Sequence, residues 1–230
     1  MLPKISTGCR SIDRTLGGGI LSGDISLIYG EPETGKTAIS MQCAINCAMQ
    51  GFKALFVDCD GTFSVERLSQ IASKDFGRIA ELIVLMRPVN FRDQVLIVDR
   101  TADYVTKHFG LIVYDTITSL YRSEVAEAPS RAFELNRELN RQLASLAQIA
   151  RLRRIAVQVT SQVRTAFEQE CISVEPVASR VLKFWADTII NLKPTENAHV
   201  IKACLEKPSF QGSSCYLKID ESGIADYTSH

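Results

Sequence analysis

Residues 30–37 carry side chains and glycines that could bind the phosphates of a nucleotide. The segment reads Gly30-Glu31-Pro32-Glu33-Thr34-Gly35-Lys36-Thr37 and fits the pattern G-x-x-x-x-G-K-[ST]. In this pattern the glycines let backbone N–H groups turn toward phosphate oxygens, and the following helix adds about half a positive charge. Lys36 would reach the β- and γ-phosphates, and the Thr37 hydroxyl would hold Mg²⁺. The pattern predicts a site for ATP with Mg²⁺, and Ala38 completes the expected contacts.

The neighbouring segments favour that interpretation. Residues 25–29 are an apolar run that predicts a strand leading into the loop, and residues 36–50 predict a helix leading out of it. A chance match in a glycine-rich turn is the alternative, but it would not require this order of strand, loop and helix. Downstream, residues 111–114 form an apolar run that ends in Asp115. Such a run predicts a buried strand, and an Asp at its C-terminal end can reach Mg²⁺ beside the phosphate loop.

Strand and helix patterns alternate over most of the chain, which predicts the fold class. Strands are expected at residues 25–29, 54–58, 82–85, 111–115, 155–160, 186–192, 200–205 and 216–219. Helices are expected at residues 36–50, 64–74, 91–107 and 131–151. This order predicts an α/β fold with a mostly parallel twisted sheet, flanking helices and an antiparallel, strand-rich C-terminal edge. Residues 124–130 and 164–177 are expected to be irregular loops.

Length and composition limit the class of protein. The 230 residues are 46% hydrophobic, which is enough for one large domain over residues 1–230. No apolar run reaches transmembrane length, and the N-terminus lacks an apolar signal region, so we expect a cytoplasmic protein without membrane contact. The seven cysteines include no C-x-x-C pair. Cys43 and Cys47 are four apart on a predicted helix and could hold a metal, but buried packing is the favoured interpretation.

The charge balance constrains any contact with nucleic acid. Lysine plus arginine and aspartate plus glutamate balance at 26 each. A protein that holds nucleic acid by bulk positive charge is therefore excluded, and a DNA contact must come from a local patch. Residues 131–165 are one candidate, with seven arginines and two glutamates. The alternative is a solvated helix face with arginines near its C-terminus, where cations suit the helix dipole.

Four further segments, together with the phosphate loop, resemble the RecA/RadA recombinase superfamily over nearly the whole chain. They are residues 6–20 before the first core strand, residues 57–63 (similar to D-T-E-G-x-F), residues 113–118 and residues 160–163 (similar to T-N-Q-V). Within the superfamily the chain resembles the archaeal RadB branch of core-only recombinase paralogues. The residues before Ser6 leave no room for the helical DNA-binding domain of RadA, the polymerising Phe-x-x-Ala element is absent, and residues 205–212 are similar to the RadB tail.

The resemblance implies a RecA-like ATPase core that takes part in homologous recombination and DNA repair. It implies ATP and Mg²⁺ as cofactors. It implies single-stranded or branched DNA as a partner, bound independently of its sequence. The implied protein partner is a full-length RadA-type recombinase or a junction nuclease, and a homo-oligomer is compatible with the family.

Three residues outside the phosphate loop match functional positions of the family. Asp60 stands where the family glutamate polarises the attacking water, Arg67 matches the arginine that stacks on adenine, and Gln162 matches the glutamine that senses the γ-phosphate. Aspartate is one methylene shorter than glutamate, so its carboxylate falls roughly 1–1.5 Å short, and a misplacement of about 1 Å can cost about 100-fold in rate. We therefore expect ATP binding with weak hydrolysis. The alternatives are a surface arginine at Arg67 and a polar residue in a turn at Gln162.

The two stretches expected to be irregular match the DNA-facing loops of the family. The first lacks the family's glycine-rich, arginine-containing pattern and carries extra acid, and residues 176–179 of the second replace the usual Gly-Gly. These departures argue against strand exchange. The remaining candidates for phosphate contacts are Arg131, Arg164, Arg180 and Lys183. Two other functions stay open: a non-catalytic, ATP-switched interaction protein for a recombinase or nuclease, and a KaiC-like signalling ATPase that does not use DNA.

Overall fold

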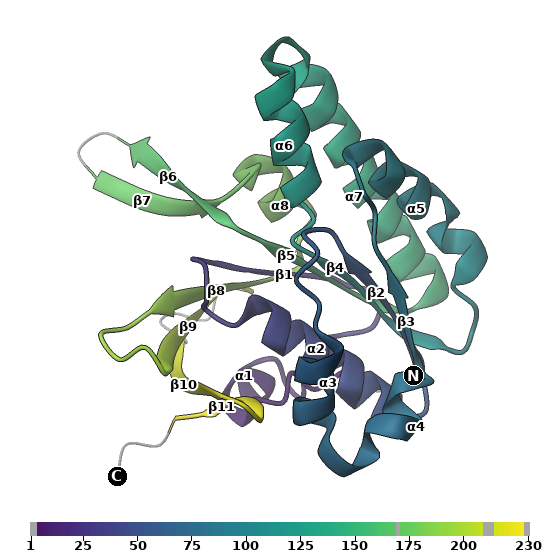
Figure 1. Cartoon of the computed structure of the whole chain (residues 1–230). Coiled ribbons are helices and arrows are strands. Elements are labelled where there is room, and N and C mark those ends of the chain that lie inside the picture. The colour runs from purple at the N-terminus through teal and green to yellow at the C-terminus, as the bar shows by residue number, and fades with distance from the viewer. Residues whose placement is uncertain (1–3, 169–170, 209–213, 228–230) are drawn as a thin grey trace.

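A nine-stranded sheet forms the centre of the molecule, in the order β11-β10-β9-β8-β1-β5-β4-β2-β3 (Figure 1). The computed structural model describes residues 4–168, 171–208 and 214–227. The strands from β8 to β3 in this order run parallel, and β9, β10 and β11 add an antiparallel edge. Their bounds are β1 Ile25–Gly30, β2 Lys53–Asp58, β3 Ile83–Met86, β4 Phe109–Asp115, β5 Ala156–Ser161, β8 Thr188–Pro194, β9 Val200–Lys207, β10 Ser214–Asp220 and β11 Gly223–Asp226.

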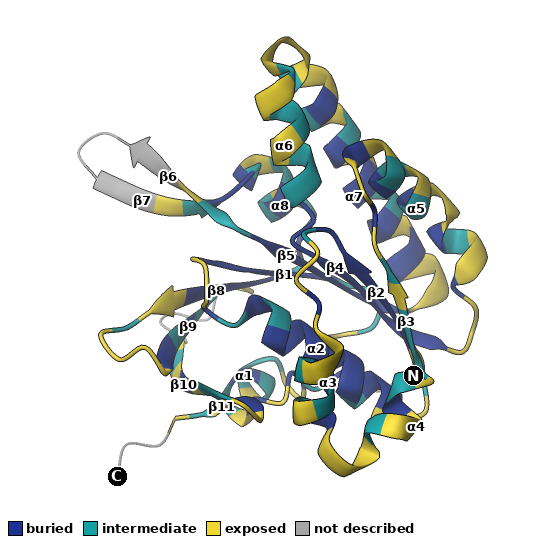
Figure 2. Cartoon of the chain, in the orientation of Figure 1, coloured by how far each residue is buried: buried dark blue, intermediate teal, exposed yellow. Residues whose placement is uncertain are grey.

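Helices cover both faces of the sheet, and each face has its own hydrophobic core. One layer contains α1 (Arg10–Thr15), α2 (Lys36–Met49), α3 (Val65–Ala72) and α4 (Phe76–Ala80). The other contains α5 (Phe91–Tyr104), α6 (Ser119–Glu127), α7 (Ala132–Arg153) and α8 (Ser179–Trp185). Because both faces are covered, β1, β4 and β5 are buried at every position. Figure 2 shows these buried central strands between helices whose outer faces are exposed.

The predicted fold class is confirmed by this parallel sheet with its antiparallel C-terminal edge. The packing interpretation of Cys43 and Cys47 is also confirmed, since both side chains are buried. Among the residues that the structure describes, no group of three or more His, Cys, Asp or Glu side chains is placed to hold a metal ion. No helix in the same part of the chain has the length and apolar character needed to span a bilayer.

The prediction of an irregular loop at residues 124–130 was wrong. Helix α6 continues to Glu127, and a short 3-10 helix, Pro129–Arg131, leads into α7. The stretch contains no glycine, so nothing in it favours a break before Pro129, and proline is well suited to the first position of the next helix.

The prediction of an irregular loop at residues 164–177 was also wrong for most of its length. Strands β6 (Val163–Glu168) and β7 (Cys171–Pro176) pair in an antiparallel hairpin that projects from the sheet (Figure 1). Branched and aromatic residues at alternate positions of these strands favour this pairing. Residues 169 and 170 lie outside the described part of the chain.

Candidate nucleotide and DNA sites

The phosphate loop connects the buried strand β1 to the N-terminus of α2, as the sequence pattern predicts. Two of its residues must be glycine for steric reasons. A Cβ at Gly30 would collide with the carbonyl oxygen of Leu192, and a Cβ at Gly35 would collide with the side chain of Ile224. Gly35 also has a positive φ of 81°, which residues other than glycine rarely adopt. The loop backbone can therefore lie close to a ligand at the start of α2.

Lys36 is held at the floor of this loop by backbone carbonyl groups. Its side chain is 8% exposed, and its Nζ donates hydrogen bonds to the carbonyl oxygens of Gly30 at 3.0 Å and Glu31 at 2.7 Å. It forms no ion pair with any residue that the structure describes. Burial lowers the pKa of Lys36, and the nearby carboxylates of Asp115, Asp60 and Glu31 oppose that shift. An anionic ligand at the loop would supply the missing counter-charge.

Asp115 lies beneath the loop at the C-terminal end of β4 and is fully buried. One carboxylate oxygen, Oδ1, accepts a hydrogen bond from the Thr160 hydroxyl at 2.6 Å, whereas Oδ2 has no hydrogen-bond partner among the described residues. Burial raises the pKa of Asp115 to about 6, although the Thr160 and Thr37 hydroxyls beside it lower that pKa. A buried carboxylate oxygen without a partner, next to a hydroxyl, fits the hard oxygen ligands that Mg²⁺ requires.

Asp60 lies on the loop after β2, and the buried Asp58 carboxylate with its half-exposed partner Arg87 fixes that loop. The Asp58 carboxylate, which is fully buried, accepts hydrogen bonds from the backbone N–H groups of Thr62 and Phe63, each at 3.1 Å. Arg87 donates to the same carboxylate through Nε at 3.0 Å and to the Phe63 carbonyl at 2.7 Å. Asp60 itself accepts a hydrogen bond from the Thr62 hydroxyl at 2.7 Å. Asp60 is therefore bound to its own loop.

Arg67 lies in the first turn of α3, whose N-terminus is capped by the Ser64 hydroxyl. Its guanidinium donates hydrogen bonds to the carbonyl oxygens of Asp220 and Glu221 in the β10–β11 turn. These bonds connect the N-terminal half of the chain to its C-terminal hairpin. Gln162 lies between β5 and the β6–β7 hairpin and lines the same pocket as Arg67.

These elements enclose a cleft of about 410 Å³ at the carboxyl ends of the parallel strands. It brings together many of the residues predicted for the site: Pro32, Glu33, Gly35, Lys36, Thr37, Ala38, Asp60, Arg67 and Gln162. Gly30, Glu31, Thr34 and Asp115 do not line it, because they form its base and supporting contacts. Sequence reasoning missed Met41, Thr62, Ser64, Thr116 and Ile219. Of these, Thr62 and Thr116 had a signal, since they lie in the family-like segments 57–63 and 113–118.

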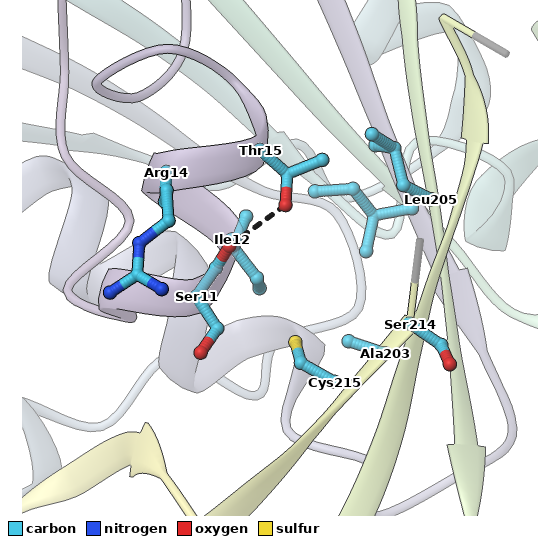
Figure 3. A pocket seen from close by; sticks show the side chains of 9 residues that line it. Ser11, Ile12, Arg14, Thr15, Ala203, Leu205, Ser214 and Cys215 are labelled. Atoms are coloured by element: carbon cyan, nitrogen blue, oxygen red, sulfur yellow. Dashed lines mark hydrogen bonds between the residues drawn. The ribbon is translucent and has the colours of Figure 1, made fainter. Parts of the chain in front are cut away.

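A second, smaller pocket of about 260 Å³ lies between α1 and strands β8 to β10 (Figure 3). Its floor is apolar, with Ile12, Ala203 and Leu205, and Thr15 on its wall donates a hydrogen bond to the Ser11 carbonyl at 3.0 Å. None of the residues predicted for the nucleotide or DNA sites lines this pocket.

The three arginines and one lysine that are predicted to contact DNA differ in their surroundings. Arg131 bridges Glu124 and Glu134 at 3.2 Å, and Lys183 pairs with Glu206 at 3.4 Å. Arg164 and Arg180 are exposed and form no ion pair within the described ranges.

The backbone between the β6–β7 hairpin and α8 has an unusual conformation at one residue. Ala178 has a positive φ of 54° and belongs to residues 176–179, which stand where the resembled family usually has Gly-Gly. Alanine at this position therefore adopts the left-handed backbone conformation that glycine favours. It lies directly before α8, at the base of the β6–β7 hairpin.

Comparisons with known proteins agree with this geometry. The model of the Rad51 family matches residues 1–227. The "DNA repair and recombination protein RadB" of Thermococcus gammatolerans is 38% identical over 229 residues, covering 96% of this chain and 98% of that protein. The protein of the same name from Methanosphaera stadtmanae is 34% identical over 218 residues, covering 93% and 92%. A solved structure described as "Crystal structure of the RadB recombinase" superposes with a TM-score of 0.82 at 31% identity, covering 97% of this chain and 100% of the other.

Proposed function

Since this chain belongs to the Rad51 family and to its RadB group, we propose that it is an ATP-binding and DNA-binding accessory protein of homologous recombination and DNA repair. The observation that carries the proposal is that Lys36 and Asp115, two buried charged groups at the cleft, form no ion pair with each other or with another described residue. Lys36 is buried against backbone carbonyls, and Asp115 Oδ2 is buried without a partner. Buried charges are costly unless they are paired. A ligand with phosphate and a divalent cation would pair both.

In this proposal each cleft residue has a separate role. The loop backbone and Lys36 bind the β- and γ-phosphates, and Arg67 presents its guanidinium face to the adenine. Thr37 and Asp115 would hold Mg²⁺, which when bound neutralises charge on the phosphates. Gln162 lies between the cleft and the β6–β7 hairpin, so it could respond to the γ-phosphate on one side and move the hairpin on the other.

We propose that hydrolysis is weak because of Asp60. Its side chain is one methylene shorter than that of the family glutamate, and its Oδ1 is hydrogen-bonded to Thr62 within its own loop. Both features hold the carboxylate back from a water molecule at the γ-phosphate. Binding of ATP would be little affected, because it depends on the phosphate loop, Lys36 and the cation.

DNA binding is proposed at the base of the β6–β7 hairpin, through cations that contact phosphates independently of sequence. Arg164 and Arg180 are available for such contacts, whereas Arg131 and Lys183 would first have to exchange their carboxylate partners. The helical α6 and Ala178 depart from the glycine-containing loops of the resembled family. For this reason the proposal excludes strand exchange by this protein itself.

We further propose that residues 1–230 act as a single RecA-like domain that assists another protein. One continuous sheet joins the phosphate loop to the C-terminal hairpin, and Gln42 on α2 exchanges two hydrogen bonds of 2.8 Å with the backbone of Ile224 on β11. Candidate partners are a full-length RadA-type recombinase, a junction nuclease or further copies of this chain. Its place of action would be the cytoplasm.

The test is a pair of binding titrations on the purified protein. A fluorescent ATP analogue with and without Mg²⁺ measures nucleotide affinity, and the anisotropy of a labelled single-stranded oligonucleotide measures DNA affinity at several salt concentrations. We expect both ligands to bind, with log K falling by about 0.7 per unit of log salt for each phosphate contact. Absence of ATP binding would overturn the nucleotide site. ATP binding without DNA binding would favour a signalling ATPase or a protein-interaction role instead.

A further inference from the structure

Helix α8 holds a large aromatic side chain out in solvent. The side chain of Phe184 is 73% exposed. Its ring stands edge-on to that of Trp185, with 5.2 Å between the ring centroids and 89° between the planes. Trp185 is itself fixed, because its Nε1–H donates a hydrogen bond to Asn140 Oδ1 on α7 at 2.8 Å and its ring packs against the core between α7 and the sheet. The orientation of the exposed ring is therefore set by the fold.

A cation shares the exposed face of this helix. Arg180 is one helical turn before Phe184, and residues four apart lie on the same face of a helix, about 5–6 Å from each other. Arg180 is exposed and makes no ion pair within the part of the chain that the structure describes. Lys183, three residues after Arg180, is instead engaged by Glu206 and the ring of Tyr29. The outer face of α8 thus presents one aromatic ring and one cation.

A second exposed phenylalanine provides a contrast within the same molecule. Phe133, at the start of α7, is 82% exposed, so exposure alone does not distinguish the two rings. Its neighbour Arg131 is bound to Glu124 and Glu134, and Glu127 adds a further acid at that tip. An anionic ligand would meet paired cations and carboxylates there. At α8 it would meet Arg180, with Arg164 at the base of the adjoining hairpin.

We propose that Phe184 is a stacking platform for an unpaired nucleobase and that Arg180 binds the phosphate of the same strand. The inference rests on the proposed DNA binding and names two side chains that would hold a single strand. A single strand exposes the faces of its bases, and aromatic side chains stack on them with little regard to sequence. A duplex hides those faces in its own stack, so it could use Arg180 but not Phe184.

The experiment compares substitutions on the full chain by anisotropy with a labelled oligothymidine and with a duplex of equal length. Phe184→Ala should weaken single-strand binding by roughly tenfold and leave the salt slope unchanged, whereas Phe184→Tyr should stay within about twofold because a ring is retained. Arg180→Ala should reduce the salt slope by about 0.7. Phe133→Ala is the matched control and should leave affinity within about twofold, since its ring is expected to meet no base. Thermal melting of each variant checks that the fold is intact.

A fluorescent base reports stacking directly. With 2-aminopurine in the oligonucleotide, the wild-type protein should quench the base, and Phe184→Ala should lose that quenching. If the wild-type protein binds no single strand at all, the proposed DNA binding fails together with this inference. If it binds but Phe184→Ala behaves like Phe133→Ala, only this inference fails, and the ring belongs to a contact with another protein. Equal losses for single strand and duplex would also overturn stacking.

Discussion

The nucleotide cleft and the helical surface formed by α6, α7 and α8 both carry many charges, but they satisfy them differently. At the cleft, Lys36 and Asp115 are buried and form no ion pair with any described residue, although their opposite charges interact at longer range. On the helical surface, Arg131 holds Glu124 and Glu134, and Arg141 holds Glu138 and Asp99 with contacts as short as 2.7 Å. The cleft is therefore incomplete without a ligand, whereas these two arginines of the helical surface already have carboxylate partners.

This difference indicates where a substitution should matter. An exposed ion pair contributes about 0–1 kcal/mol, because water screens it and two long side chains must be ordered. A hydrogen bond to a desolvated charge contributes about 1.5–3 kcal/mol. Changes in the cleft should therefore have large effects on ligand binding, and changes to paired surface arginines should have small ones.

The largest effect is expected for Lys36→Ala, which should strongly weaken nucleotide binding and leave the fold intact. Removing the ammonium loses a charge-assisted contact with the phosphates of about 1.5–3 kcal/mol, or about 10- to 150-fold in affinity. Titration with a fluorescent ATP analogue measures the loss. Lys53→Ala, an exposed lysine at the start of β2, is the control and should bind as the wild-type protein does. Unchanged affinity in Lys36→Ala would make the phosphate-loop assignment wrong.

A smaller effect is expected for Arg87→Ala, which removes the counter-ion of the buried Asp58 carboxylate. We expect the free energy of unfolding to fall by about 1–3 kcal/mol, because Asp58 keeps its two backbone donors and Arg87 is half exposed. The loop that carries Asp60 should loosen, so ATP turnover should fall while ATP affinity is kept.

The matched control for that change is Arg78→Ala, which breaks an exposed pair with Asp75 at 3.5 Å. It should cost less than about 0.5 kcal/mol. Urea unfolding of both variants measures the contrast. Equal losses in the two variants would show that burial of Asp58 does not distinguish its ion pair from a surface pair.

The smallest effects should come from the cations of the DNA-facing side. Arg164→Ala, at a residue without an ion pair in the described structure, should flatten the dependence of log K on log salt by about 0.7 for single-stranded DNA. Arg131→Ala should change that slope less, because Arg131 is already bound to two carboxylates. Anisotropy over a series of salt concentrations separates the two. A larger change for Arg131→Ala would mean that DNA displaces the carboxylates.

The cleft could be predicted from the sequence because its chemistry is local. The phosphate loop is one contiguous segment, and the position of Asp115 follows from a buried strand in a parallel sheet. The wall formed by Ile219 could not be predicted, since it comes from a hairpin far along the chain whose packing depends on the whole sheet.

The helical surface was harder to predict because its contacts, like that of Ile219, join residues that are far apart in the sequence. Lys183 pairs with Glu206 and Arg141 pairs with Asp99, and because these partners are distant in sequence, the two ion pairs leave no local pattern. Phe184 gave no signal because an exposed aromatic residue reads like a core one, and the bond from Trp185 to Asn140 that positions it spans 45 residues. Residues 124–130 were expected to match a family loop, but their own helix-forming residues continue α6.

The most direct test of the account is steady-state ATP turnover of the wild-type protein and of Asp60→Glu, at saturating ATP and Mg²⁺, with and without single-stranded DNA. The account predicts slow hydrolysis by the wild-type protein and roughly tenfold faster hydrolysis by Asp60→Glu, because the longer side chain brings its carboxylate to the attacking water. ATP affinity should be the same for both, since Asp60 is not expected to touch the phosphates. Equal or lower turnover in Asp60→Glu would contradict the account and show that Asp60 does not limit the chemistry.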